Sequence, residues 1–129
     1  METPMDTMIA DYMEGGFLDN IIEMFRQDPA LFALLPQLMA DERMRVRLGT
    51  AALVESLREE QTDRLARLVP ELAALLRSPS PTVRGDVIYV LGVIGSRDAV
   101  PYLQPACEDE NPGVRQLARE TLVELTGNP

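Results

Sequence analysis

An internal repeat constrains the fold of this 129-residue chain more than any other feature of its sequence. The dipeptide Val-Arg occurs three times, and each copy is followed by mostly apolar residues 4, 7, 8 and 11 positions after the valine. The three dipeptides are Val46-Arg47, Val83-Arg84 and Val114-Arg115. Offsets of 0, 4, 7, 8 and 11 lie on one face of an α-helix. The repeat therefore predicts three amphipathic helices that pack in the same way.

A second shared element precedes each Val-Arg dipeptide: an apolar residue, then proline, then leucine two residues after the proline. Its copies are Leu35-Pro36-Gln37-Leu38, Val69-Pro70-Glu71-Leu72 and Val100-Pro101-Tyr102-Leu103. Ser80 and Asn111 each stand directly before a further proline, where a side-chain oxygen can cap the start of the second helix. The repeating unit is therefore predicted to be a helix, a tight turn and a second helix.

This pattern resembles the short HEAT-like repeats, of the type also found in phycobilin lyases, over about residues 29–126. The resemblance implies an all-α fold, a short α-solenoid of about three HEAT-like helix pairs. It also implies a ladder between neighbouring repeats, made by a turn aspartate and the arginine of the second helix. Asp41 with Arg47 and Asp109 with Arg115 stand at matching positions, but the middle copy has Ser78, so we expect an incomplete ladder there. Tetratricopeptide repeats, the alternative, keep a stricter spacing and an aromatic pattern that is absent here.

Residues 1–28 lie outside the repeat and contain seven acidic residues and one arginine. A first amphipathic helix is predicted up to Gly15-Gly16, and a second runs from Phe17 to Phe25 and stops near Asp28-Pro29. The end of a solenoid needs a cover with a polar outside, so we expect an N-terminal helical hairpin cap. The alternative is a contact surface on the first helix, for a partner or for a homodimer. Its apolar stripe is Met5, Met8, Ile9, Tyr12 and Met13.

The length indicates a single domain. We expect it to comprise the N-terminal helical cap at residues 1–28, a divergent first repeat at 29–61, a second repeat at 62–96 and a third at 97–126. The longest apolar stretch has nine residues, from Val87 to Gly95, and is too short to span a bilayer. The acidic N-terminus differs from a secretory signal, and a single cysteine suits a reducing compartment, so we expect a cytoplasmic protein.

The composition argues against most catalytic chemistry. The chain has no histidine, which excludes imidazole catalysis and the common zinc and di-iron sites. Cys107 has three acidic neighbours, which disfavour a reactive thiolate, and it occupies a predicted core position. The acidic turn at residues 108–111 lacks the ligand spacing of a calcium loop. We therefore expect no catalytic residues, metal or cofactor.

The net charge of −9 argues against nucleic acid and anionic membranes as partners. A protein partner is expected instead, because the second helices of HEAT-like repeats line a concave surface. The candidate contact residues lie outside the apolar register: Ala52, Ser56, Ile88, Tyr89, Val93, Arg119 and Glu120. Tyr89 is the expected anchor, although a central helix that is apolar all round can also be buried by its neighbours.

The sequence therefore predicts a non-enzymatic protein-interaction module or small adaptor that presents a curved surface. Two alternatives remain open. One is a bilin-lyase-like or chaperone-like accessory protein, which the resemblance allows. The other is a structural homo-oligomer that assembles through the first helix.

Overall fold

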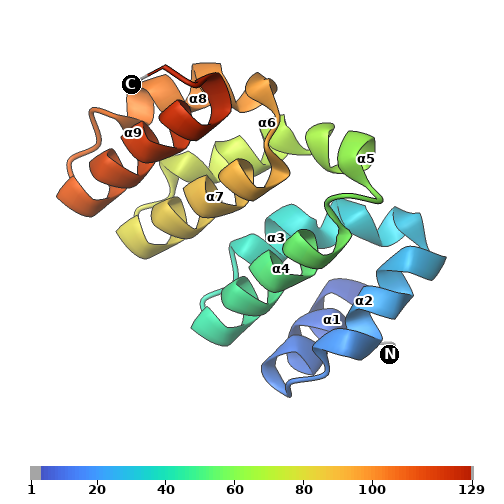
Figure 1. Ribbon diagram of the computed structural model, residues 1–129. Helices are drawn as coiled ribbons and strands as arrows, with labels where there is room; N and C mark the ends of the chain where they lie inside the picture. Colours follow the sequence, from blue (N-terminus) through green and yellow to red (C-terminus); the bar gives the residue numbers. More distant parts are fainter. Residues whose placement is uncertain (1–3, 129) are drawn as a thin grey trace.

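The structure is a computed structural model that describes residues 4–128, and it is a small all-α solenoid (Figure 1). No strand occurs among the described residues. The α-helices are α1 (Met5–Glu14), α2 (Leu18–Gln27), α3 (Leu35–Met39), α4 (Met44–Leu57), α5 (Thr62–Ala66), α6 (Val69–Ala73), α7 (Pro81–Ile94), α8 (Val100–Ala106) and α9 (Pro112–Thr126). Three 3₁₀ segments extend them, η1 (Pro29–Leu34), η2 (Ala74–Arg77) and η3 (Arg97–Ala99).

The three predicted helix pairs are α3 with α4, α6 with α7, and α8 with α9. The first helices of the pairs begin at Leu35, Val69 and Val100, the residue before each repeated proline. Proline is tolerated there because the N–H that it lacks has no acceptor within the helix. We call α3, α6 and α8 the A helices and α4, α7 and α9 the B helices.

Local sequence signals set the ends of the B helices. The side chains of Ser80 and Asn111 accept hydrogen bonds from the backbone N–H of Val83 and Val114, as the predicted caps require. Gly95 and Gly127 end α7 and α9 in the left-handed conformation, with φ of 74° and 73°. Glycine adopts this conformation at little cost, so both helices stop where the register ends.

The helices form two layers. The B helices lie side by side and run in the same direction, and α7 contacts both α4 and α9 (Figure 1). The first helix, α1, also packs against α4. The A helices form the second layer. Each A helix covers the apolar face of its own B helix, which is why neither layer could be stable alone.

The core follows the predicted register. All five register positions of α4 are buried, and four of five in α7 and three of five in α9 are buried as well. The exceptions, Ile94, Leu122 and Leu125, are partly buried against the same core. They lie toward the C-terminal ends of α7 and α9.

The predicted apolar stripe of the first helix is buried on one side and exposed on the other. Ile9 and Met13 are buried, and the Met13 side chain lies where a Cβ at Gly49 of α4 would stand. These two residues therefore pack inside the chain, and the prediction that they belong to a dimer surface is wrong. Met5 and Tyr12 are exposed, and Met8 is partly buried. The stripe is wider than the contact with α4, so only one edge of it is covered.

The sequence did not predict α5 or the 3₁₀ segments, which are too short for a helical period. The boundaries expected after residues 28, 61 and 96 fall between helices, but the division into a cap and three repeats stays a prediction. None of the helices within residues 4–128 is long and apolar enough to cross a membrane.

Candidate functional site

The exposed side of the B helices is the candidate binding surface, and we call it the B face. Of the seven predicted residues, Ser56, Arg119 and Glu120 are exposed, while Ala52 and Val93 are partly buried. Tyr89, the expected anchor, retains 47% of its accessible surface and lies outside the core. The prediction for Ile88 is wrong, because its side chain is completely buried.

Ile88 is buried because its position in α7 faces the next repeat rather than solvent. It stands five residues after the valine of its repeat, and Ala51 at the equivalent position of α4 is also buried. The equivalent residue of α9 is Arg119, which is exposed and donates to the backbone oxygen of Cys107. No further repeat follows α9 in the described chain, so this position is covered in two helices and solvated in the third.

The Tyr89 side chain connects two B helices. Its hydroxyl donates a hydrogen bond to a carboxylate oxygen of Glu55 on α4. This bond to a charged acceptor raises the pKa of Tyr89, and partial burial of the ring adds to the effect. The phenol therefore stays neutral, and its hydrogen bond to Glu55 spans the junction between α4 and α7.

Sequence reasoning missed three exposed apolar residues of the B helices: Met44, Leu48 and Val123. Leu48 stands two residues after the repeat valine, where α7 has Gly85, and 54% of its surface is exposed. The sequence did contain a signal for this. Leu48 lies outside the apolar register, on the side of α4 where polar residues are expected, and yet it is apolar. The B face thus has more apolar surface on α4 than the sequence had indicated.

The arginines of the three repeats bind backbone oxygens within their own repeats. Nη1 of Arg47, Arg84 and Arg115 donates to the carbonyl oxygen six residues earlier, on Asp41, Ser78 and Asp109, at 2.8, 2.8 and 2.7 Å. A carbonyl acceptor does not depend on the side chain, so Ser78 serves as well as aspartate. The prediction of an incomplete ladder at the middle repeat is therefore wrong in this respect.

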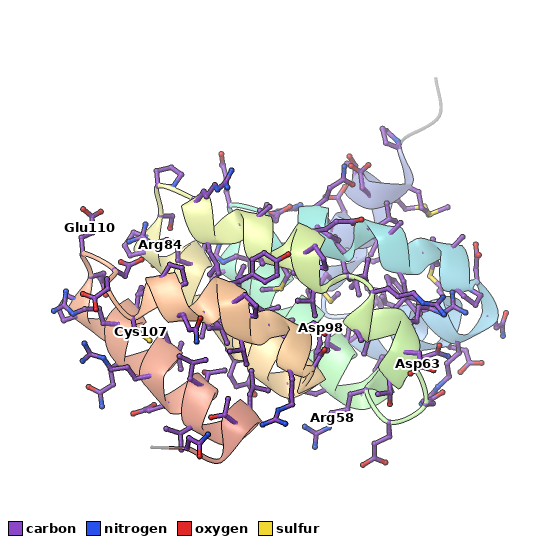
Figure 2. All side chains as sticks on the ribbon, turned by 90° about the horizontal axis from the view of Figure 1, so that it is seen from above. Arg58, Asp63, Arg84, Asp98, Cys107 and Glu110 are labelled. Carbon is purple, nitrogen blue, oxygen red and sulfur yellow. The ribbon has the colours of Figure 1, made fainter. Side chains whose placement is uncertain are left out.

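The same arginines also connect neighbouring repeats. Nε and Nη2 of Arg84 donate to both carboxylate oxygens of Asp109 in the next turn, each at 2.9 Å. Nε of Arg47 donates at 2.8 Å to Asp86 of α7, which replaces the aspartate missing at position 78. Both guanidinium groups are buried, and such paired geometry stabilises a buried charge. Figure 2 shows Arg84 beside Glu110 at one edge of the stack.

The ladder predicts that the protein loses stability at acid pH. The hydrogen bonds from Arg84 lower the pKa of Asp109 below its ordinary value. Protonation of Asp109 therefore removes the stabilisation as the pH falls through this lowered value. We expect the wild-type melting temperature to fall below about pH 4, and the Asp109→Asn variant to show a smaller fall. Thermal melts of both proteins from pH 7 to pH 2.5 measure this difference, and parallel curves would contradict it.

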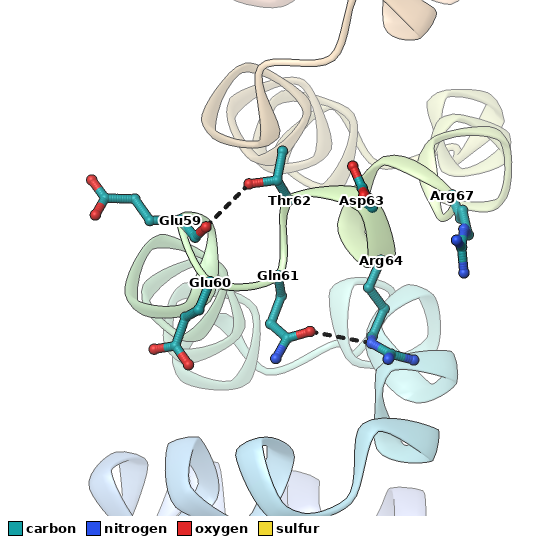
Figure 3. A pocket seen from close by; sticks show the side chains of 7 residues that line it. All are labelled: Glu59, Glu60, Gln61, Thr62, Asp63, Arg64 and Arg67. Carbon is teal, nitrogen blue, oxygen red and sulfur yellow. Dashed lines mark hydrogen bonds between the residues drawn. The ribbon is translucent and has the colours of Figure 1, made fainter.

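A polar hollow lies between α4 and α5 and is lined by Glu59, Glu60, Gln61, Thr62, Asp63, Arg64 and Arg67 (Figure 3). Several of these side chains already have structural partners. Thr62 donates to the backbone oxygens of Arg58 and Glu59, Arg64 donates to Gln61, and Glu60 accepts from Arg26 of α2. The side chains of Thr62, Arg64 and Glu60 thus stabilise the turn between α4 and α5 and its contact with α2.

Cys107 is partly buried and packs against the core, and its thiol donates weakly to the backbone oxygen of Leu103 at 3.6 Å. The acidic turn after it is used by the ladder, because Asp109 also caps the N–H of Asn111. Among residues 4–128, no cluster of three or more acidic, cysteine or histidine residues is arranged to hold a metal ion.

Comparison with protein families shows that residues 69–129 match the HEAT repeats family. The matched segment contains the second and third repeats, including Arg84, Asp109 and Arg115. It supports the resemblance to HEAT-like repeats, but not the narrower resemblance to the phycobilin-lyase type. No curated protein and no solved structure matches the chain.

Proposed function

We propose that this HEAT-like repeat chain is a non-enzymatic protein-interaction module that binds a partner protein across the B face. Short helical solenoids commonly act through an extended, rigid surface of this kind. In this chain the ladder joins α4 to α7 and α7 to the turn before α9. The three helices thus present their exposed sides as one surface.

The exposure of Leu48 and Tyr89 on neighbouring B helices is the observation that supports this proposal most directly. Burial of an exposed leucine or tyrosine side chain by a partner removes apolar surface from water, which contributes favourably to the free energy of binding. Because Tyr89 is already bonded to Glu55, less side-chain freedom is lost on binding. Exposed Ser56, Glu120 and the Glu55 carboxylate supply a polar rim.

We expect Tyr89→Ala to weaken binding of the partner by at least about 1 kcal/mol, which is roughly a fivefold higher Kd. The melting temperature should change little, because the ring lies outside the core. The partner is first captured from a lysate of the source cells by cross-linking to the tagged chain and identified by mass spectrometry. Titration of this purified partner with wild type and variant then gives the two affinities.

Tyr102→Ala is the matched control. Tyr102 is also exposed, but it lies on the A helix α8, in the other layer. The Tyr102→Ala variant should bind the partner with wild-type affinity if the B face is the binding surface. Wild-type affinity of both Tyr89→Ala and Leu48→Ala would contradict the proposal.

The accessory-protein alternative makes a different prediction. A chain that handles bilins should shift and sharpen the visible absorbance of a free bilin on mixing, because binding fixes the conformation of the chromophore. For an interaction module we expect the spectrum of added biliverdin to stay unchanged at micromolar concentrations of both components. A saturable spectral shift would favour the bilin-handling alternative.

A further inference from the structure

The outer side of α1 carries an exposed apolar stripe that the packing of the chain leaves unused. Met5 and Tyr12 stand seven residues apart, two helical turns, and expose 45% and 43% of their surfaces. Met8 lies between them and is partly buried. Phe17, 54% exposed, extends the stripe through its ring, whose centroid lies 5.7 Å from that of Tyr12. We call Met5, Met8, Tyr12 and Phe17 the α1 stripe.

The α1 stripe is not an edge of the core. The contact of α1 with α4 is made by its other side, where Ile9, Ala10 and Met13 are buried. Tyr12 points about 100° away from Met13 around the helix axis. Two exposed aromatic rings in contact, beside two flexible methionines, are typical of a surface that adapts to an apolar partner.

The charge around the stripe restricts what can cover it. Among residues 4–28 there are six acidic side chains and a single arginine, Arg26, which is paired with Glu60 and Glu23. Arg43 of the turn before α4 pairs with Asp11, so five of these carboxylates remain outside that pair. Asp19 is exposed two residues after Phe17. A second copy of the chain would bring the same negative charge to the contact, and an anionic lipid surface would also be repelled. A positively charged apolar partner is attracted.

We infer that the α1 stripe is a second docking surface and that it binds an amphipathic helix of another protein with leucine-like residues on one face and Lys or Arg beside them. The apolar face of such a helix covers Met5, Tyr12 and Phe17. Its basic side chains lie near Asp19 and the other carboxylates of the hairpin. This helix-on-helix mode uses anchors at helical spacing on both partners. The α1 stripe shares no residue with the B face, so we count it as a second binding surface.

The test uses a fluorescein-labelled synthetic peptide of 18 residues, composed of leucine and lysine in a helical amphipathic pattern, and measures its anisotropy with the purified full chain. We expect saturable binding that weakens as salt is raised, because part of the attraction is between charges. The double variant Tyr12→Ser/Phe17→Ser should bind at least about tenfold more weakly. A peptide of the same pattern with glutamate in place of lysine should not bind.

The control is the double variant Leu48→Ser/Tyr89→Ser, which alters the B face and keeps the α1 stripe. It should bind the peptide as the wild type does, so the result does not depend on the proposed function of the B face. Asp19→Lys should weaken binding without any change to an apolar residue, which guards against a folding defect in the serine variant. Equal affinity of the wild type and the Tyr12→Ser/Phe17→Ser variant would show that charge alone attracts the peptide, and it would overturn the inference. So would self-association of the chain alone, in sedimentation, that the Tyr12→Ser/Phe17→Ser variant abolishes.

Discussion

Replacement of Ile88 by alanine should lower the free energy of unfolding by about 3 kcal/mol. The side chain is completely buried in α7, at the position that faces α9. Its truncation leaves a cavity between α7 and α9. The Arg84–Asp109 pair joins these neighbouring repeats and restricts the relaxation that could fill the cavity. Urea denaturation followed by circular dichroism measures the loss directly.

The neighbouring substitution Tyr89→Ala provides the comparison. It should cost less than about 1 kcal/mol of stability, because the ring is nearly half exposed and loses mainly one hydrogen bond at the surface. Similar losses for the two adjacent residues would contradict the division of α7 into a side that faces the next repeat and a solvated side.

Removal of the central guanidinium of the ladder should have the second large effect. Arg84→Ala leaves the Asp109 carboxylate without its paired donors and the Ser78 carbonyl without its hydrogen bond. We expect the melting temperature to fall by about 10 °C, the size expected when one partner of a buried ion pair is removed. Differential scanning calorimetry at pH 7 measures the change.

Arg115→Ala is the matched control for the ladder. Arg115 makes the same bond to the carbonyl six residues earlier, but among the described residues it has no carboxylate partner in a following repeat. Its loss should lower the melting temperature by only a few degrees. Equal effects at positions 84 and 115 would mean that the bond within the turn, rather than the pair between repeats, supplies the stabilisation.

The fold could be predicted because each repeat carries its own local signals. The register after each valine fixed the buried face of each B helix, and the apolar-Pro elements marked where the A helices begin. Ser80, Asn111 and the closing glycines act through hydrogen bonds and backbone angles within a few residues. Such short-range effects do not depend on the rest of the chain. The short helix α5 has no periodic pattern and could not be found in this way.

The binding surface could be predicted only in part, because exposure depends on neighbouring helices. Helical periodicity within a single B helix distinguishes the residues that face the A helix from all other residues of that helix. It does not show which of these other residues pack on the next B helix, and this distinction decides between Ile88 and Tyr89. The partner of Arg47 was hidden for the same reason, since Asp86 lies 39 residues away in sequence and on another helix.

The position of Asp109 has a consequence for how the protein opens. This one carboxylate accepts both donors of Arg84 and also caps the turn before α9. The last helix pair therefore cannot separate from α7 without giving up the order of its own turn. Native-state hydrogen exchange should show the amides of α8 and α9 opening together, as one cooperative unit, rather than fraying residue by residue from the C-terminus. The amides of α7, which is held on both sides, should exchange only through global unfolding.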